Sequence, residues 1–391
     1  MRQPIKKKVA EANNIDVTKS IYTLVVDGNN LLKISFVDKR MNNDGEEYGG
    51  VLVFLRLLGT ILSKKDFDYC SVCWDGTGSG VLRWEMYKDY KANRDKHYEL
   101  HSTKTEYDRY IENYAKRVIA YSKSKKNEVN YVRGETEEES FERQKTILQS
   151  ILEELCIRQY EFDNVEGDDI ISYLVHNKKD NEKVIIVSSD KDLTQLISSD
   201  VAVWNPRMKE FITESNSIDM IGITHKNVVL EKILCGDASD NIKGVKGLGE
   251  TTLVKLFPEI VKNETNLEAI IRRSKELLDE RKQAKKKPLK SLENIVNGVT
   301  DGCQGDKLYE INRKIIDLSV PLLTEEAKKE LNEVLYAPID TDDRDLKNAY
   351  NIINENKMYD LIDEEKFGNT LAPYSRIMMM EKRRYNNFKK S

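Results

Sequence analysis

Nine carboxylates of this chain fall into five short clusters, and three of the clusters directly follow apolar, β-branched runs. The nine residues are Asp27, Asp75, Glu166, Asp168, Asp169, Asp190, Asp192, Asp237 and Asp240. The runs IYTLVV, DYCSVCW and KVIIVSS lead into Asp27, Asp75 and Asp190, and each run predicts a buried strand with its acid at the carboxyl end. Ligands bind at this edge of open α/β sheets, so the pattern constrains the fold class and the location of the site together.

The remaining acids are predicted to lie on helices. Glu166 to Asp169 open the helical pattern GDDIISYLV, and Asp237 and Asp240, three residues apart, are expected to share one helical face. Oxygen-only clusters favour hard divalent cations, here Mg²⁺ with Mn²⁺ as a substitute, and this many acids suggests two ions. A single Asp at a strand end can instead form a turn or cap a helix, but that alternative gives no reason for five clusters in series.

Length and charge set limits on the rest of the chain. At 391 residues it exceeds one ordinary domain, which favours an α/β core with helical additions. Lysine and arginine total 63 against 67 acids, and this net charge of −4 by itself argues against a nucleic-acid partner. A metal site concentrates acids in one place, however. The basic runs at residues 123–126 (KSKK) and 281–290 (RKQAKKKPLK) indicate that the remaining surface carries positive stripes.

Cysteines, histidines and apolar runs exclude several other classes. Five cysteines do not suggest a secreted disulfide framework, and Cys70 and Cys73 are expected to be buried on a strand because no second Cys or His pair follows at zinc-finger spacing. His97 and His101 lack a third ligand and are interpreted as solvated helix positions. The amino terminus has no apolar signal segment and no run reaches the ~20 residues of a membrane span, so we expect a cytoplasmic protein with no membrane partner.

Composition divides the chain into four segments. Residues 1–20 form a polar tail, and residues 21–225 form the predicted core, with a helical, Tyr-rich excursion at about 76–136. Residues 226–340 are predicted to be helical, beginning with two helices joined by a tight glycine turn. The last segment, residues 341–391, is acidic and then rich in Met, Lys and Arg, and its pattern assigns it no role.

Particular elements can also be predicted. They are a strand at Tyr22–Val26, a helix at Val51–Leu62, a helix near Glu138–Cys156, a strand at Val184–Val187, a hairpin at Val201–Thr213 with Asn205-Pro206 as its turn, and helices interrupted at Pro288 and Gly298.

Basic and aromatic residues alternate just after Asp75. Their spacings of 4, 3, 1 and 3 predict one shared helical face for Arg83, Tyr87, Tyr90, Lys91 and Arg94. Such a stripe can hold a phosphate by charge while a ring stacks on a base. The alternative is an amphipathic surface helix with its aromatic residues turned inward. The position beside a predicted metal-site acid favours the nucleic-acid interpretation.

A second phosphate site is predicted at the glycine turn. Gly244, Gly247 and Gly249 precede a helix start at residues 250–252, where exposed backbone N–H groups suit a phosphate. The glycines would also permit a plain turn between packed helices. Lys243 and Lys246 within the turn favour the phosphate interpretation.

Taken together, these motifs resemble those of the structure-specific 5′ nucleases, the family of flap endonucleases and of the 5′ nuclease domains of bacterial DNA polymerases. The resemblance rests on VDGNNLL, YKANRDK, EGDD, SSDKDLTQL and GDASDNIKGVKGLG in this order, between Tyr22 and Phe257. Within the family it looks closest to the ribonuclease H of T-even-type bacteriophages. It implies an α/β core with a mostly parallel sheet flanked by helices, an inserted helical arch and a helix-three-turn-helix subdomain.

The resemblance also implies roles for the acids. One metal would be surrounded by Asp27, Asp75, Glu166 and Asp168. The second would be surrounded by Asp168, Asp190, Asp192 and Asp237. Asp169 and Asp240 would support them, directly or through water.

Two further elements are carried over in the same way. Tyr90, Lys91 and Arg94 match the gateway motif of the family, where the basic pair contacts the scissile phosphate. Gly244 to Gly249, with the adjoining Lys243 and Thr251, match the helix-three-turn-helix that grips duplex DNA, often with a bound K⁺. Residues 281–290 and the tail after about residue 340 have no counterpart.

The expected function is that of a monomeric, Mg²⁺-dependent 5′ nuclease. It would act on RNA primers, RNA–DNA hybrids and flapped or nicked duplex DNA in replication and repair, with a single-strand-binding protein and a sliding clamp as partners. A small ribonuclease of the PIN class is disfavoured because it would lack the glycine turn. A non-catalytic scaffold that binds branched DNA is disfavoured because every expected acid is present. A P-loop NTPase is disfavoured because the chain contains no G-x-x-x-x-G-K-[ST].

Overall fold

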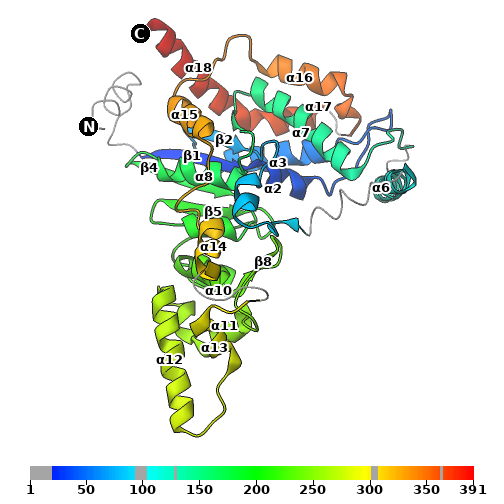
Figure 1. Ribbon diagram of the computed structural model, residues 1–391. Coiled ribbons are helices and arrows are strands. Elements are labelled where there is room, and N and C mark those ends of the chain that lie inside the picture. The colour runs from blue at the N-terminus through cyan, green and yellow to red at the C-terminus, as the bar shows by residue number, and fades with distance from the viewer. Residues whose placement is uncertain (1–19, 93–103, 127–129, 301–306, 362–363) are drawn as a thin grey trace.

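The computed structural model of the protein describes residues 20–92, 104–126, 130–300, 307–361 and 364–391. A six-stranded sheet lies at its centre (Figure 1). The strands are β1 (Ile21–Asp27), β2 (Tyr69–Cys73), β3 (Arg158–Tyr160), β4 (Glu182–Val187), β5 (Val201–Asn205) and β6 (Glu210–Ile212). Their order is β3-β2-β1-β4-β5-β6, and only the β5–β6 hairpin is antiparallel. The predicted α/β fold with a mostly parallel sheet is confirmed.

The chain runs outward from β1 through β2 to β3 and then crosses back to pair β4 with the other side of β1. The strand order therefore reverses at β1, and the carboxyl ends of β2, β1 and β4 lie next to one another. Such a reversal opens a crevice at the carboxyl edge of a parallel sheet. The three acidic clusters that follow apolar runs, at Asp27, Asp75 and Asp190, fall at this edge.

Helices lie on the two faces of the sheet, and the sequence supplies side-chain caps for two of those named next. They are α2 (Gly28–Ser35), α3 (Gly49–Leu62), α7 (Glu137–Glu154) and α8 (Gly167–His176). Asp27 caps α2 by accepting the N–H of Asn30 at 3.0 Å. Thr136 and Glu139 form a reciprocal capping box at the start of α7. The predicted helices at Val51–Leu62 and near Glu138–Cys156 are confirmed.

A helical subdomain extends below the sheet in Figure 1. Its elements are α9 (Ser217–Ile221), α10 (Val228–Cys235), β7 (Gly236–Asp237), β8 (Ile242–Lys243), α11 (Glu250–Leu256), α12 (Leu267–Gln283), α13 (Lys290–Asn297) and α14 (Lys307–Ile316). Helix α15 (Glu325–Val334) lies above the sheet in Figure 1, and its Ala327 and Leu331 belong to the core of the sheet. Two helices joined by a glycine turn are present as predicted, at α10 and α11. The helical pattern breaks around Pro288 and at Gly298, also as predicted.

Two predicted helical faces are wrong. Helix α4 (Val81–Met86) ends before Tyr87, whose backbone is extended, and Lys91 has a left-handed φ of 54°. Arg83, Tyr87, Tyr90 and Lys91 therefore do not share one helix, because the chain turns to dock on the loop that follows Asp237. Asp237 ends β7 and residue 240 lies in the turn before β8, so Asp237 and Asp240 share no helical face either. Arg94, His97 and His101 lie outside the described residues.

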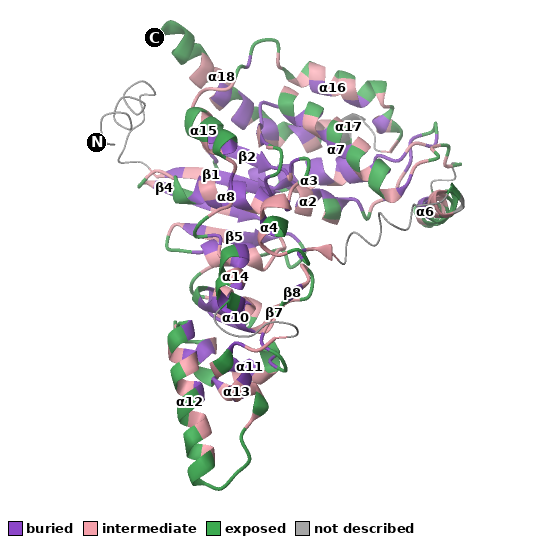
Figure 2. Ribbon diagram, in the orientation of Figure 1, coloured by how far each residue is buried: buried purple, intermediate pink, exposed green. Residues whose placement is uncertain are grey.

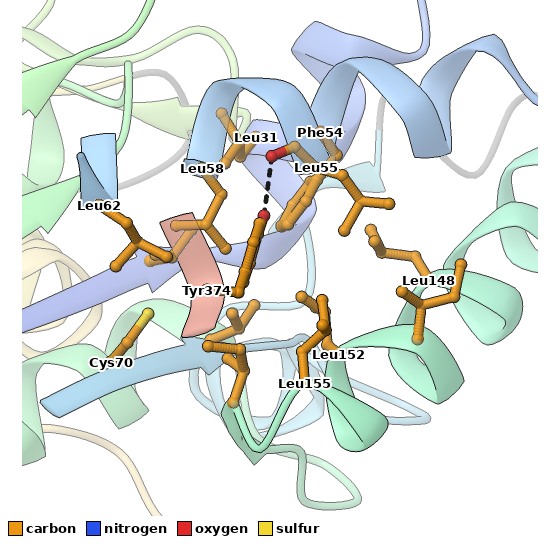
Figure 3. Packing of buried hydrophobic residues seen from close by; sticks show 14 of the residues in the cluster. Leu31, Phe54, Leu55, Leu58, Leu62, Cys70, Leu148, Leu152, Leu155 and Tyr374 are labelled. Carbon is orange, nitrogen blue, oxygen red and sulfur yellow. Dashed lines mark hydrogen bonds between the residues drawn. The ribbon is translucent and has the colours of Figure 1, made fainter. Parts of the chain in front are cut away.

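The carboxyl-terminal segment is part of the main core. Helices α16 (Leu346–Glu355), α17 (Glu364–Leu371) and α18 (Ser375–Lys390) lie beside α3 and α7 (Figure 1), and Figure 2 shows their inward faces buried. The buried Tyr374 hydroxyl donates to the carbonyl of Leu55 in α3 at 2.8 Å (Figure 3). Glu381 of α18 accepts two hydrogen bonds of 2.9 Å from the buried guanidinium of Arg158 on β3. The sequence pattern did not reveal this packing.

Replacing Tyr374 with alanine is expected to lower the free energy of unfolding by about 3 kcal/mol, because it removes a fully buried ring and leaves a cavity. Urea unfolding followed by circular dichroism measures the loss. Phe388→Ala near the far end of α18 is the control, since that ring is 62 % exposed and its removal should matter little. An equal loss in both variants, or in neither, would contradict the inclusion of the terminal segment in the core.

Two smaller expectations can also be compared with the structure. Cys70 and Cys73 are buried free thiols on β2, as predicted. None of the helices in the described ranges combines the length and the apolar content that crossing a membrane requires.

Candidate metal centre

Acids from three neighbouring strands and one helix meet at the carboxyl edge of the sheet. Asp27 is the last residue of β1, Asp75 follows β2, Asp190 follows β4, and Asp168 lies in the first turn of α8. Asp27 and Asp168 each experience repulsion from Asp75 and Asp190. The structure thus brings together four of the nine predicted acids in one cluster, which we call the carboxylate cluster.

Hydrogen bonds from neighbouring residues hold two acids of the carboxylate cluster, Asp75 and Asp27, in place. The amide of Asn29 donates to Asp75 Oδ2 at 2.8 Å, and the N–H of Gly167 donates to Asp75 Oδ1 at 2.7 Å. Ser188 Oγ donates to Asp27 Oδ2 at 2.8 Å. These supporting residues were not singled out from the sequence, although Asn29 lies within the VDGNN motif and Ser188 directly follows β4. Their role depends on the pairing of the strands.

The acids of the carboxylate cluster repel one another, and this repulsion shifts their pKa values. Burial, together with Asp75 and Asp190, raises the pKa of Asp27 to about 7. Burial raises the pKa of Asp168 well above its usual value, and the neighbouring carboxylates raise it further. Desolvated carboxylates that repel one another are stabilised by a cation. The donor set is oxygen-only, which fits a hard divalent ion.

A second pair of acids lies beside the cluster and shares one lysine. Lys232 of α10 forms ion pairs with both Asp192 and Asp237. Burial raises the pKa of Asp192 to about 6 although Lys232 opposes the shift. Burial would also raise the pKa of Asp237, but hydrogen bonds from Lys232 and Ser239 bring it down to about 2. Sequence reasoning missed Lys232. The signal that could have revealed it is its position in an apolar helix that leads directly into the acidic motif GDASD.

Glu166 and Asp169 are neutralised by a buried arginine. Arg83 is 6 % exposed, and its guanidinium hydrogen-bonds to Glu166 and Asp169 while its Nε donates to the carbonyl of Ile315 at 2.9 Å. Asp169 also accepts the N–H of Leu322 at 2.9 Å. The predicted DNA contact of Arg83 is therefore wrong, because the side chain is committed to buried partners. Because Asp169 faces Arg83, it is better placed to support the metal site than to coordinate a metal ion directly.

The gateway segment, residues 87–91, docks on residues 240–241 beside Glu166. The N–H of Lys91 donates to the carbonyl of Asp240 at 2.9 Å, and the Tyr87 hydroxyl donates to the carbonyl of Asn241 at 3.3 Å. The Tyr90 hydroxyl donates to Glu166 at 3.0 Å and to Asp240 at 3.3 Å, and Lys91 forms an ion pair with Glu166. Tyr90 and Lys91 therefore lie next to the acids as predicted, whereas the Tyr87 hydroxyl bonds to the supporting loop and its ring packs against the apolar core of the helical subdomain.

Among the described residues, no three acidic, His or Cys side chains form a ready-made metal-ligand group. Three of the predicted ligands are paired with cations of the chain itself, since Glu166 is held by Arg83 and Lys91, and Asp192 and Asp237 are held by Lys232. The carboxylate cluster contains four of the predicted ligands, and the other acids adjoin it. Coordination by all nine acids remains a prediction.

The glycine turn between α10 and α11 presents its lysines to solvent. Lys243 and Lys246 are exposed, as are Gly247, Gly249 and Thr251. Gly247 has a left-handed φ of 76°. At Gly244 a Cβ would come within 2.1 Å of the carbonyl carbon of Cys235, so close packing against the start of the turn requires glycine there. The turn thus has a structural reason for Gly244 and an exposed basic face as well.

Fold and site together define a class of α/β protein with an acidic centre at the carboxyl edge of a parallel sheet and a helical subdomain attached beside it. The protein-family model described as "5′-3′ exonuclease, N-terminal resolvase-like domain" matches residues 22–226, more than half of the chain. The chain belongs to the 5′-3′ exonuclease family.

Two relatives illustrate how the chain is related to longer and shorter proteins. DNA polymerase I of Bacillus subtilis is 29 % identical over 254 residues, which are 63 % of this chain but 24 % of the polymerase. The chain thus spans about a quarter of that relative's length. The 5′-3′ exonuclease of Aquifex aeolicus is 26 % identical over 286 residues, which are 72 % of this chain and 83 % of the exonuclease.

Two solved structures share the fold. The 5′-exonuclease of bacteriophage T5 with bound zinc has a TM-score of 0.54 at 16 % identity, over 87 % of this chain and 99 % of the T5 chain. The T5 flap endonuclease in complex with DNA and metal ions has a TM-score of 0.51 at 18 % identity, over 86 % of this chain and 99 % of that one. At these identities the likeness establishes the fold alone.

Proposed function

We propose that the protein is a divalent-metal-dependent 5′ nuclease that hydrolyses phosphodiesters at the 5′ ends or flaps of branched and nicked duplexes. The observation that carries the proposal is the carboxylate cluster, with Tyr90 and Lys91 placed directly beside it. Family membership supports the reaction class. A cluster of repelling acids next to a cationic side chain suits a substrate that brings both a metal ion and a phosphate.

The residues of the cluster would hold the metal ions. Asp27, Asp75, Asp168 and Asp190 are the inner candidates, and Glu166, Asp192 and Asp237 adjoin them. Two divalent ions, when bound there, supply an activated water and stabilise the leaving 3′ oxygen. Mg²⁺ suits the all-oxygen donor set, with Mn²⁺ as its substitute.

The gateway residues would act on the phosphate itself. Lys91 keeps part of its side chain accessible, 26 %, although it forms an ion pair with Glu166. A phosphate that approaches the cluster can therefore recruit the ammonium group, which adds positive charge where negative charge develops. Tyr90 holds Glu166 and Asp240 in place through its hydroxyl and so acts as a positioning residue. Arg94 is proposed as the second cation by the motif alone.

The substrate is proposed to include RNA-primed duplexes as well as flapped DNA, with ribonuclease H activity and primer removal in replication. This finer assignment is supported by the resemblance to the ribonuclease H of T-even-type bacteriophages. Duplex would be held by the exposed Lys243 and Lys246 of the glycine turn, with K⁺ as a further ligand there. A single-strand-binding protein and a sliding clamp are proposed as partners on the same resemblance.

The experiment that tests the proposal uses a 5′-labelled flap DNA and an RNA-primed DNA duplex, each incubated with the protein in Mg²⁺ or in EDTA. Release of short 5′ products in Mg²⁺ and none in EDTA is the expected result. The ratio of the two cleavage rates ranks DNA against RNA. Binding to both substrates without cleavage under Mg²⁺ and Mn²⁺ would instead support a branch-binding scaffold.

Replacing Lys91 with alanine is expected to slow cleavage about 10²-fold, because the phosphate loses one preorganised positive charge. Single-turnover rates across a Mg²⁺ titration measure the effect, and the half-saturating Mg²⁺ concentration should change little. Lys88→Ala is the matched control, since that lysine is exposed in the same segment and lies over the ring of Trp84, away from the acids. A rate for Lys91→Ala equal to that of the control would remove Lys91 from the mechanism.

A further inference from the structure

The segment that joins α12 to α13 forms a basic tip at the end of the helical subdomain away from the sheet (Figure 1). We define the basic tip as residues 281–290, which carry six Lys or Arg side chains and no acid. Its five lysines are exposed, and within the described part of the chain none of them forms an ion pair with a carboxylate. Of the three acids in the second half of α12, which are Glu276, Asp279 and Glu280, the two glutamates pair with Arg273 instead. The tip is therefore a concentration of positive charge that this chain does not neutralise.

The tip is a closed turn and not an extended linker. The N–H of Lys286 donates to the carbonyl of Arg281 at 2.8 Å, and Arg281 Nε donates to the carbonyl of Lys287 at 2.9 Å. Lys285 adopts a left-handed φ of 52°, where glycine usually ends a helix. The side chain of Arg281 thus has a structural role, whereas the charges of Lys285, Lys286 and Lys287 have no partner in the tip itself.

Helix α13 connects the tip to the glycine turn. It begins in the tip at Lys290, and from the middle of the helix Asn294 donates to the carbonyl of Lys246 at 2.8 Å. Just beyond the helix, Thr300 Oγ1 donates to the carbonyl of Gly244 at 2.7 Å. An eight-residue helix is about 12 Å long, which is roughly the rise of four base pairs of duplex. The two exposed basic elements are therefore held in one packed unit.

We propose that the basic tip is a second contact for the phosphate backbone of duplex nucleic acid, beyond the glycine turn and away from the metal centre. The inference rests on the proposed function, because the duplex held at the glycine turn is its starting point. Lysines act as point charges that meet phosphates without reading sequence, so the contact adds affinity and not sequence specificity. A duplex is favoured over an acidic protein segment because α13 ties the tip to a turn already suited to phosphates.

The test compares affinity for nicked duplexes whose downstream arm is short, roughly 8 base pairs, or long, roughly 24 base pairs, at several salt concentrations. Fluorescence anisotropy in Mg²⁺ is measured in the Asp190→Asn background to prevent turnover. The tip variant changes Lys285, Lys286 and Lys287 to glutamine. The control variant makes the same change at Lys123, Lys125 and Lys126 at the end of α6 (Lys104–Ser124), which are also exposed and also include one left-handed residue, Lys126.

The parent protein should bind the long duplex more tightly than the short one. The tip variant should lose about tenfold in affinity for the long duplex and should no longer gain affinity with duplex length. The slope of its log affinity against log salt concentration should fall by the equivalent of up to about three phosphate contacts. The control variant should keep the gain. A Lys243→Gln, Lys246→Gln variant should lose affinity for both lengths, which separates the turn from the tip.

Three results would overturn the proposal: no gain with length in the parent protein, an unchanged gain in the tip variant, or an equal loss in the control variant. Thermal unfolding of each variant checks that the subdomain remains folded. A separate cleavage assay tests the proposed function, which would fail if the wild-type protein showed no Mg²⁺-dependent cleavage of either duplex.

Discussion

Replacing Asp190 with asparagine is expected to reduce metal-dependent cleavage on the order of 10³-fold while leaving affinity for branched DNA largely intact. Asp190 contributes negative charge to the centre of the carboxylate cluster, where it raises the pKa values of Asp27 and Asp168. Asparagine keeps the Oδ1 atom that accepts the N–H of Asp192 at 2.9 Å. The substitution therefore removes a charge from the proposed metal site and preserves the local hydrogen bonding.

Single-turnover cleavage and anisotropy binding measure the two halves of this prediction on the same flap substrate. Asp219→Asn is the control, because that acid is exposed on α9, away from the carboxyl edge of the sheet. Folding should not suffer in the Asp190 variant, since one repulsive charge is removed. Wild-type cleavage rates, or a loss of binding as large as the loss of cleavage, would contradict the assigned role.

Replacing Arg83 with methionine is expected to lower the free energy of unfolding by about 3–5 kcal/mol at neutral pH. The substitution leaves the buried carboxylates of Glu166 and Asp169 without their shared counter-charge, and such breakage of a buried pair is costly. Burial already raises the pKa of Asp169 even with Arg83 in place. Urea unfolding measures the loss, with Arg207→Met, at an exposed position, as the control.

The pH dependence of the Arg83 variant tests the cause of that loss. Without Arg83, the folded-state pKa values of Glu166 and Asp169 should rise above their unfolded values, so these acids destabilise the fold as pH rises through the unfolded pKa. Protonation at lower pH relieves the penalty. The deficit relative to wild type should therefore be smaller at about pH 5 than at about pH 8. A deficit that is the same at both pH values would assign the loss to packing alone.

Much of the fold could be predicted because the strands and helices of this chain carry strong local signals. The apolar runs before Asp27, Asp75 and Asp190 became β1, β2 and β4, and the acids arrived at one edge because parallel strands align their carboxyl ends. The glycine turn was predicted from Gly244 and its neighbours, since these residues mark a break between two apolar periodic segments. For these strands and this turn, the local sequence pattern was enough to predict the structure.

The gateway segment shows where local pattern failed. The spacing of Arg83, Tyr87, Tyr90 and Lys91 fits a helix, yet the segment leaves the helix after Met86 to bond with residues 240–241. That docking involves residues some 150 positions away in sequence. Spacing alone could not distinguish an exposed arginine from one that neutralises two buried acids, because the difference lies in partners brought by other elements.

The sequence by itself determined which acids exist, which of them end strands, and that a glycine turn separates two helices, because hydrophobic period and turn chemistry are local. Only the tertiary structure decided that Arg83 is buried, that Lys232 bridges Asp192 and Asp237, and that the described part of the carboxyl-terminal segment completes the core against α3. Each of these depends on burial and on charge pairing between distant segments. Such energies arise only when the chain has folded, because desolvation and opposite charge act through space and not along the sequence.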